Sequence, residues 1–357
     1  MQTNFGVNDP LAVKLWAKKL AVQALQQTWF KNFISTDGNN VCYMMDETEK
    51  SAGDTVNVGL RVQLSGAGVQ GDGTLEGQEE ALTTYADKLL IDQLRHAVNV
   101  GGRMSQQRVP FELREEARMG LQDWWAGRFD TSFFNQLCGY TPQTDTRFTG
   151  NNAAIAPTNT TAGPRLILPS TYTSESQLTS TDTFSLALID TAVERAYLNN
   201  PYMIRPIKVD GNEKYICFIS PSQVTDMRTS TTTGQWLDIE KSAMTGGEVS
   251  NNPLFSGALG EYNGTILHKA FRVTAAVSNV TSAAIASTAR APFCGAQALA
   301  LGFGREQGKD QFTWVEELFD YGNILGVSAG SIFGIKKMVF NSADFGVQVI
   351  ATYAKAH

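Results

Sequence analysis

Residues 54–93 carry the feature that most constrains the fold of this chain, an arm of two extended segments around a glycine-rich turn. The first segment places apolar side chains two residues apart, so they share one side of a strand: Val56, Val58, Leu60, Val62 and Leu64. The second segment alternates again after the turn GAGVQGDGTLEG. An isolated two-stranded arm is at best marginally stable in water. We therefore expect the arm to lie on another surface, and a second copy of the chain is a candidate for that surface.

Length and composition favour a globular protein with two lobes. The chain has 357 residues, of which 42% are hydrophobic and 18% charged, with 32 glycines; this composition is typical of a strand-containing fold. The net charge of -6 and the absence of a basic run argue against a wide phosphate-binding face. Neither a long apolar stretch nor a signal-peptide pattern is present, so we expect a soluble protein made in a cytoplasm.

The cysteines and histidines are scattered. Cys42, Cys138, Cys217 and Cys294 show no paired spacing, and the three histidines form no metal-binding pattern. We expect the cysteines to be buried and reduced, and we expect no metal or cofactor.

Two amphipathic helices are predicted, one on each side of the arm. The first begins at Asp9 and Pro10, which suit a helix N-terminus, and its apolar stripe includes Trp16. The second runs over residues 110–138 and would be roughly 42 Å long, which exceeds the width of a small domain. Its first turns hold Glu112, Arg114, Glu115 and Arg118. We interpret these charges as a solvated face that supports the helix, with contact to a second copy as the alternative.

The rest of the chain predicts a mixed lobe. Residues 141–182 are rich in Ser and Thr, and this composition predicts a long connection between the lobes. A helix is predicted over 183–198, a hairpin around Asp210 and Gly211, a strand after Gly264 and a final strand from Val347. Helices and strands do not alternate regularly, which indicates an α+β fold.

Three motifs are candidates for chemistry. Residues 66–71 match Gly-x-Gly-x-x-Gly, but no helix is expected after them, so a hairpin tip explains the glycines better than a nucleotide site. Four nearby acids lack the spacing of a calcium loop: Asp72, Glu76, Glu79 and Glu80. Glu316 and Glu317 are neighbours on a predicted strand and should point to opposite faces, which disfavours a catalytic carboxylate pair.

Two long runs of sequence are distinctive, VNVGLRVQLSGAGVQGDGTLEGQEEAL and IDQLRHAVNVGGRMSQQRVPFELREEARMGLQDWWAGRFD. With the shorter runs LAVKLWAKKL, NNPLFSGALGEYNGTILH, FDYGNILGVSAGSIFGIKK and DFGVQVIATYA, they resemble the major capsid proteins of tailed bacteriophages of the N-four-like type. The resemblance extends from about Leu11 to Tyr353 and is weakest in the Ser/Thr-rich connection.

The resemblance implies the Hong Kong 97-type capsid fold, in the α+β class. On that basis, the chain divides into an N-arm and lead-in (1–49), an extended β-hairpin loop (50–95), a peripheral domain with spine helix 110–138 (96–182), an axial domain (183–329) and return strands of the peripheral domain (330–357).

The implied function is structural and not enzymatic. The chain would self-assemble through hexamers and pentamers into an icosahedral head around double-stranded DNA, in the virion, after assembly in the host bacterial cytoplasm. Implied partners are further copies of the chain and portal, scaffold and decoration proteins; DNA would be held without sequence specificity, and no membrane would be involved.

The candidate contacts between copies are Val56, Val58, Leu60, Val62, Leu75, Glu76, Glu79, Glu80, Trp16, Glu112, Arg114, Glu115 and Arg118. Two alternatives remain open at this point. One is a carbohydrate-active or other hydrolytic enzyme, which would need convergent carboxylates that the sequence does not place. The other is a non-viral shell compartment with the same fold.

Overall fold

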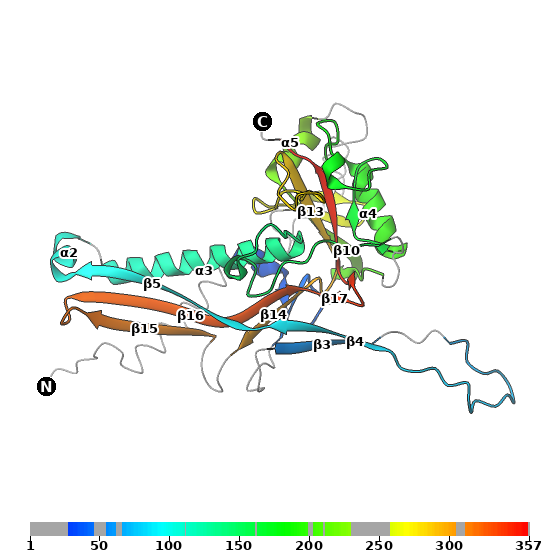
Figure 1. Cartoon of the computed structure of the whole chain (residues 1–357), viewed down its shortest axis with the longest axis horizontal. Helices are drawn as coiled ribbons and strands as arrows, with labels where there is room; N and C mark the ends of the chain where they lie inside the picture. The colour runs from blue at the N-terminus through cyan, green and yellow to red at the C-terminus, as the bar shows by residue number, and fades with distance from the viewer. Residues whose placement is uncertain are drawn as a thin grey trace.

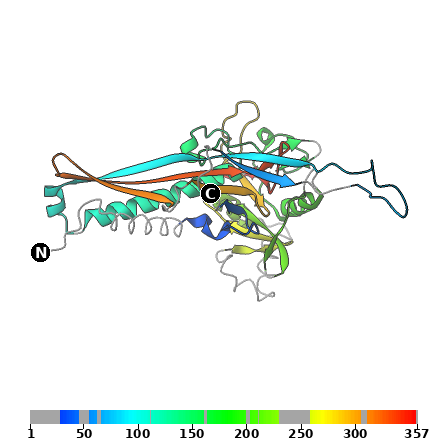
Figure 2. The ribbon, with the colours of Figure 1, turned by 90° about the horizontal axis from the view of Figure 1, so that it is seen from below.

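The computed structural model describes residues 28–45, 55–61, 66–110, 112–160, 163–198, 203–209, 211–229, 258–304 and 311–355. A rod extends to one side, a rounded lobe lies above the other end of the rod, and a hairpin projects away from the rod (Figures 1 and 2). Strands and helices occur together without regular alternation, which confirms the predicted α+β class. No helix in these ranges has the length and apolarity needed to cross a membrane.

A six-stranded sheet forms one layer of the rod. It contains β1 (Ile34–Ser35), β2 (Cys42–Met45), β14 (Leu299–Gly304), β16 (Ile324–Lys337), β15 (Phe312–Phe319) and β5 (Asp92–Gly102). The long strand β16 pairs antiparallel with β5 along one edge, and with β15 and then β14 along the other. Burial alternates along the first part of β15, because one face of the sheet packs on a helix.

Helix α3 (Leu113–Leu137) covers that face of the sheet, and we call α3 together with β5, β15 and β16 the rod. Its buried stripe includes Leu121, Trp125, Phe129 and Phe133. The Trp125 ring lies 5.0 Å from the Phe312 ring, and the Phe129 ring lies 5.0 Å from the Phe333 ring. Edge-on aromatic packing between helix and sheet therefore holds the rod together.

The long helix starts later than predicted and is preceded by a short one. Helix α2 (Arg103–Arg108) ends because Val109, the residue before Pro110, is extended with φ -105° and ψ 130°. Glu112 is the N-cap of α3, so the helix spans 113–137 and not 110–138. The predicted N-terminal helix, with Trp16, lies outside the described residues, apart from the 3₁₀ turn η1 (Trp29–Phe33).

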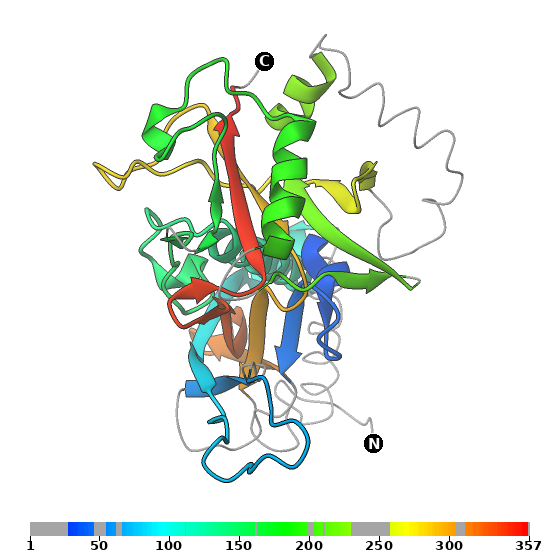
Figure 3. The same ribbon diagram turned by 90° about the vertical axis from the view of Figure 1, so that its right-hand side faces the viewer.

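A seven-stranded sheet forms the lobe. It contains β8 (Leu166–Ile167), β9 (Ile207–Val209), β10 (Asn212–Ile219), β11 (Ala258–Tyr262), β12 (Thr265–Lys269), β13 (Thr288–Cys294) and β19 (Val347–Tyr353). Helix α4 (Leu186–Leu198) lies against one face of this sheet beside β19 (Figure 3), and α5 (Pro221–Thr229) follows β10. The other face packs toward η1 and the end of α3. Both faces are covered, so β19 is almost entirely buried.

The predicted hairpin around Gly211 and the strand predicted after Gly264 are both confirmed. Strands β9 and β10 pair antiparallel around Gly211, and β11 and β12 around Asn263 and Gly264. Short elements complete the chain: η2 (Thr146–Phe148), β6 (Asn159–Thr160), β7 (Gly163–Pro164), η3 (Glu175–Gln177), β17 (Val339–Phe340) and β18 (Ala343–Asp344).

The strands of the two sheets are not separated at residue 330, as the expected segments 183–329 and 330–357 would require. Strands β14 and β15 and the first part of β16 lie in the rod's sheet although they precede residue 330, and β19 lies in the lobe's sheet although it follows it. The reason is a crossing of the chain between β13 and β14, only four residues apart, and a return crossing after β16. The division into peripheral and axial domains stays a prediction.

His268 of β12 gives the core a pH dependence. Its ring is 3% exposed and packs at 5.1 Å from the Phe33 ring. Burial disfavours the imidazolium and lowers the pKa of His268 from 6.5 to about 4. Between about pH 6.5 and pH 4 the unfolded chain gains a proton that the folded chain does not, so stability falls as the pH falls. We expect this histidine to lower the free energy of unfolding by about 3 kcal/mol across that window.

Urea titrations at several pH values within the window measure this loss. The variant His268→Phe keeps the aromatic packing and should show a smaller loss over the same range. An equal loss in parent and variant would contradict the assignment to His268.

Candidate assembly surfaces

The predicted arm is a hairpin whose base packs on its own chain. Strand β3 (Thr55–Arg61) pairs antiparallel with β4 (Thr84–Leu90), which confirms the two extended segments but shortens them. Val56, Val58 and Leu60 are half-buried and pack around Met338 and Phe340. At the base, the expected covering surface is supplied in part by the same chain, through residues after β16. A contact of its open side with another copy stays a prediction.

Polar contacts fix the hairpin base to the C-terminal part of β16, to β17 and to Asn152. The Asp87 carboxylate accepts hydrogen bonds from Lys336 Nζ and from the Val339 amide, the latter at 3.0 Å. The Asn152 side chain accepts from the Leu90 amide and donates to the Leu90 carbonyl, both at 3.0 Å. The base is therefore oriented by contacts that the strand pattern could not reveal.

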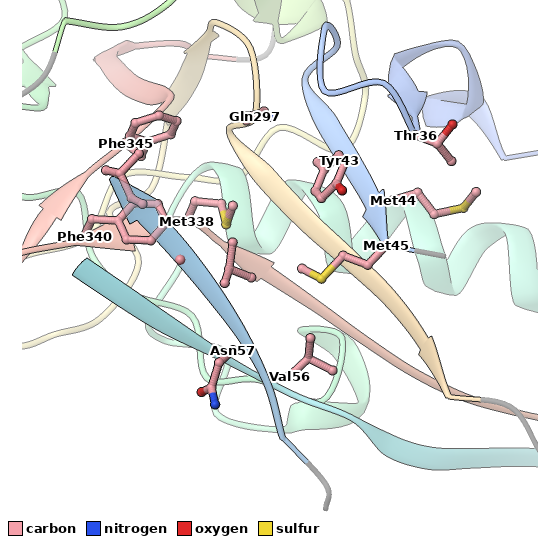
Figure 4. A pocket seen from close by; sticks show the side chains of 13 residues that line it. Thr36, Tyr43, Met44, Met45, Val56, Asn57, Gln297, Met338, Phe340 and Phe345 are labelled. Atoms are coloured by element: carbon pink, nitrogen blue, oxygen red, sulfur yellow. The ribbon is translucent and has the colours of Figure 1, made fainter. Parts of the chain in front are cut away.

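An open groove of about 710 Å³ lies between β3 and β2. Figure 4 shows Met45 and Met338 pointing into it, with Val56 on the hairpin side. No charged side chain is among its described lining residues. The groove is an uncharged surface that includes methionines, whose side chains adapt readily to different shapes.

The hairpin tip, residues Gly66–Thr83, extends into solvent (Figure 1). All of its residues are exposed, and none lies in a helix or strand. Leu75 and Leu82 are each 61% exposed, together with the acids Glu76, Glu79 and Glu80. The glycine motif 66–71 lies here, with φ of +70° at Gly68 and +67° at Gly71, so its interpretation as a hairpin tip is confirmed. The predicted contact Val62 lies outside the described residues.

The rod ends, on the side away from the hairpin, in α2 and the turn between β15 and β16, residues 320–323. We call this region the rod end. The Arg103 amide donates to the Asn323 side chain at 3.3 Å, so α2 and the turn lie side by side. Tyr321 is fully exposed, and Met104 and Phe319 are 60% and 51% exposed. Exposed apolar side chains of this size mark a contact surface when they cluster.

The predicted charged residues lie on the first turns of α3. Arg114 donates to the buried Glu316 carboxylate at 2.7 Å, and Arg118 pairs with Glu115 at 3.0 Å. Glu112 is the exposed N-cap residue. Arg118 is thus paired within α3, as expected of a supporting helix face, whereas Arg114 pairs with a residue of β15. A role in contact between copies stays a prediction.

A buried charge cluster joins α3 to the lobe, and the sequence patterns did not indicate it. Arg290 of β13 donates to the carbonyls of Cys138 and Gly139, at 3.0 and 2.7 Å, and so caps the C-terminus of α3. Its other nitrogens donate to both oxygens of Glu175, at 2.7 and 2.5 Å, and both side chains are 4% exposed. The bidentate pair fixes the angle at which the rod meets the lobe.

A second buried pair lies close by, between Lys337 Nζ and Asp344 Oδ2 at 2.9 Å, with both side chains fully buried. Burial lowers the pKa of Lys337, and the attraction of Asp344 opposes that shift. The amide of Lys337 donates to Gln136 of α3 at 3.2 Å, so this pair also lies at the end of α3.

Asp130 anchors the start of the described chain to α3. Its two carboxylate oxygens accept the Trp29 and Phe30 amides, each at 3.1 Å. Phe30 stacks on Phe133 with ring centroids 4.7 Å apart. Residues 28–33 therefore lie beside α3, a location that only the tertiary structure reveals.

The described residues bring no metal-binding cluster together, and the two candidate carboxylates lie on opposite faces of β15. Glu316 is buried against Arg114 and Trp314, and Glu317 points to the exposed face, as predicted from strand alternation. No cluster of three or more His, Cys, Asp or Glu side chains suited to a metal ion occurs in this part of the chain. All four cysteines are buried and unpaired, and burial raises the pKa of the Cys42 and Cys217 thiols, as expected for structural cysteines.

Comparison with known proteins shows similarity to phage capsid proteins. The family model described as phage capsid protein matches residues 4–356. The major capsid protein of Pseudomonas phage KPP25 is 30% identical over 97% of this chain and 96% of its own length. The capsid of Ralstonia phage GP4 matches with 38% identity and a TM-score of 0.79, covering 100% of this chain and 99% of that one. The capsid of cyanophage Pam1 shares the fold at 20% identity, with a TM-score of 0.71 over 93% and 94% of the two chains. The chain therefore belongs to the phage capsid protein family and has the Hong Kong 97-type fold that its sequence resemblance implied.

Proposed function

We propose that the chain is the major capsid protein of a phage, which assembles through hexamers and pentamers into the icosahedral head. The observation that carries this proposal is the projecting hairpin tip, whose exposed Leu75 and Leu82 have no covering surface within the described chain. The hairpin tip and the rod end extend far from the lobe in opposite directions, so each copy can reach two neighbours. Modest contacts suffice because every one of them repeats throughout a closed shell.

The function is structural, without turnover. The relatives that support it are capsid proteins. The alternative of a hydrolytic enzyme gains no support from Glu316 and Glu317, which lie on opposite faces of β15. The proposed localisation is the virion, after assembly in the cytoplasm of the host bacterium.

The proposed partners are other copies of the chain, with portal, scaffold and decoration proteins, and the enclosed double-stranded DNA. A chain with net charge -6 does not attract phosphate over a wide face. We expect DNA to be held by confinement, without sequence-specific contacts. Weak, salt-insensitive association of free subunits with duplex DNA is the expected result in a filter-binding assay.

Deleting Gly66–Glu80 tests the role of the arm. The Gly66 amide donates to Glu80 Oε2 at 2.6 Å, so the two ends of the deleted segment lie side by side and the base of the hairpin need not move. We expect a folded subunit with a near-native circular dichroism spectrum that forms no closed shells in negative-stain electron microscopy. The parent chain, expressed in the same way, is the control. Normal shells from the deletion variant would remove the arm from the assembly mechanism.

A further inference from the structure

The sequence contains a single Asn-Gly pair, Asn263 and Gly264, which forms the turn between β11 and β12. Both residues have positive φ, +46° and +69°, and Tyr262 pairs with Thr265 across the turn. Tight hairpin turns require this conformation, and asparagine followed by glycine adopts it readily. Asn263 is exposed, so the pair is open to water on the surface of the lobe.

The Asn263 side chain joins this turn to helix α4. Its amide nitrogen donates to Asp190 Oδ1 at 2.9 Å, and the hydroxyl of Tyr262 donates to Asp190 Oδ2 at 3.0 Å. One carboxylate of α4 therefore accepts from two neighbouring residues of the hairpin, and we call this contact the turn latch. Because β11 is the edge strand of the lobe's sheet, the turn latch ties the edge hairpin to α4.

An asparagine before a glycine loses its side-chain amide by a reaction with its own backbone. The Gly264 amide nitrogen, after giving up its proton, attacks Asn263 Cγ; an N–Cγ bond forms, the Cγ–Nδ2 bond breaks and ammonia leaves. Water then opens the resulting succinimide ring at either carbonyl and leaves an aspartyl or an isoaspartyl residue, with no change of oxidation state. Glycine hinders this ring closure least because it has no Cβ.

We propose that Asn263 is a site of spontaneous deamidation and that the reaction opens the turn latch. The amide that donates to Asp190 becomes a carboxylate, which has no hydrogen to donate and carries the same charge as its partner. Two carboxylates at hydrogen-bond distance repel each other. Subunits held in a closed shell are not replaced, so a slow reaction of this kind accumulates with the age of the particle.

Asp190 slows the reaction that opens the turn latch. Its hydrogen bond restrains the Asn263 side chain, and its negative charge disfavours the deprotonated nitrogen that attacks Cγ. The variant Asp190→Ala removes both effects, so we expect faster conversion of Asn263. An unchanged or slower rate in this variant would contradict the protective role of Asp190.

Peptide mapping by mass spectrometry of the full-length chain, aged in mildly alkaline buffer, tests the site. The β17–β18 turn is a matched control, because Asn341 and Ser342 are exposed there and have φ of +48° and +59°. We expect conversion at Asn263 to be about ten-fold faster than at Asn341, because serine has the Cβ that glycine lacks. Equal rates at the two positions, or no conversion at Asn263, would overturn the proposal.

Hydrogen exchange measures what the reaction does to the hairpin. The variant Asn263→Asp carries the charge of the product, and Asn263→Ser removes the amide without adding a charge. We expect backbone amides of β11 and of its turn to exchange about ten-fold faster in Asn263→Asp than in the parent, with Asn263→Ser in between. Equal exchange in all three proteins would show that the turn latch does not hold the hairpin.

Discussion

Replacing Trp125 with alanine is expected to lower the free energy of unfolding by about 3–5 kcal/mol. The side chain is fully buried between α3 and the rod's sheet, and its ring lies 5.0 Å from the Phe312 ring and 5.9 Å from the Phe333 ring. Truncation removes these contacts and leaves a cavity that the long strand β16 cannot close. Urea unfolding, followed by circular dichroism, measures the loss.

The neighbouring Trp124 is the matched control. It is half-buried and stacks on the exposed His96, with ring centroids 4.3 Å apart. Trp124→Ala should cost about 1 kcal/mol, because the ring retains water on one side. If the two alanine variants lost the same stability, Trp125 could not be the main contact between the helix and the sheet.

Replacing Glu175 with leucine is expected to cost a similar amount, about 3–5 kcal/mol, for an electrostatic reason. The substitution leaves the Arg290 guanidinium buried without its carboxylate partner. An arginine does not lose its proton in proteins, so the uncompensated charge persists in the folded state. Thermal or urea unfolding of the subunit measures the effect.

A double substitution separates this charge effect from lost packing. Glu175→Leu/Arg290→Met removes both charges, and we expect it to recover much of the stability that Glu175→Leu loses. Recovery should be incomplete because Arg290 also caps α3 through the carbonyls of Cys138 and Gly139. A double variant less stable than Glu175→Leu would show that Arg290 contributes mainly through these carbonyls.

The Lys337 and Asp344 pair provides a comparison within the same joint. Asp344→Leu should be less costly than Glu175→Leu, because burial already lowers the pKa of Lys337 and its amine can become neutral. A larger loss for Asp344→Leu in the same urea titration would contradict this difference between lysine and arginine.

Much of the secondary structure could be predicted because its causes are local. The two-residue period of Val56, Val58 and Leu60 predicted β3, and the turn residues Asn263 and Gly264 predicted the strand that follows them, β12. The resemblance of long sequence runs predicted the family and the capsid fold, and both are confirmed. In each case the information lies within a few neighbouring residues or within an unbroken run of the chain.

Two features that the sequence pattern did not predict, the burial of Trp125 and the surface under the hairpin base, depend on contacts between distant segments. Trp124 and Trp125 both fit a helical stripe, and only the position of β16 determines that Trp125 is buried. The hairpin base rests on Met338 and Phe340, more than 240 residues later in the sequence.

The sequence by itself determined the α+β class, the arm, the long helix and the family, because periodicity, turn chemistry and similarity are properties of adjacent residues. The tertiary structure alone decided which strands share a sheet, how Arg290 and Glu175 join the rod to the lobe, and that the hairpin tip and the rod end lie at opposite ends. The physical reason is that packing and buried charge pairing depend on which segments meet in space, and residues 115 positions apart meet at that joint.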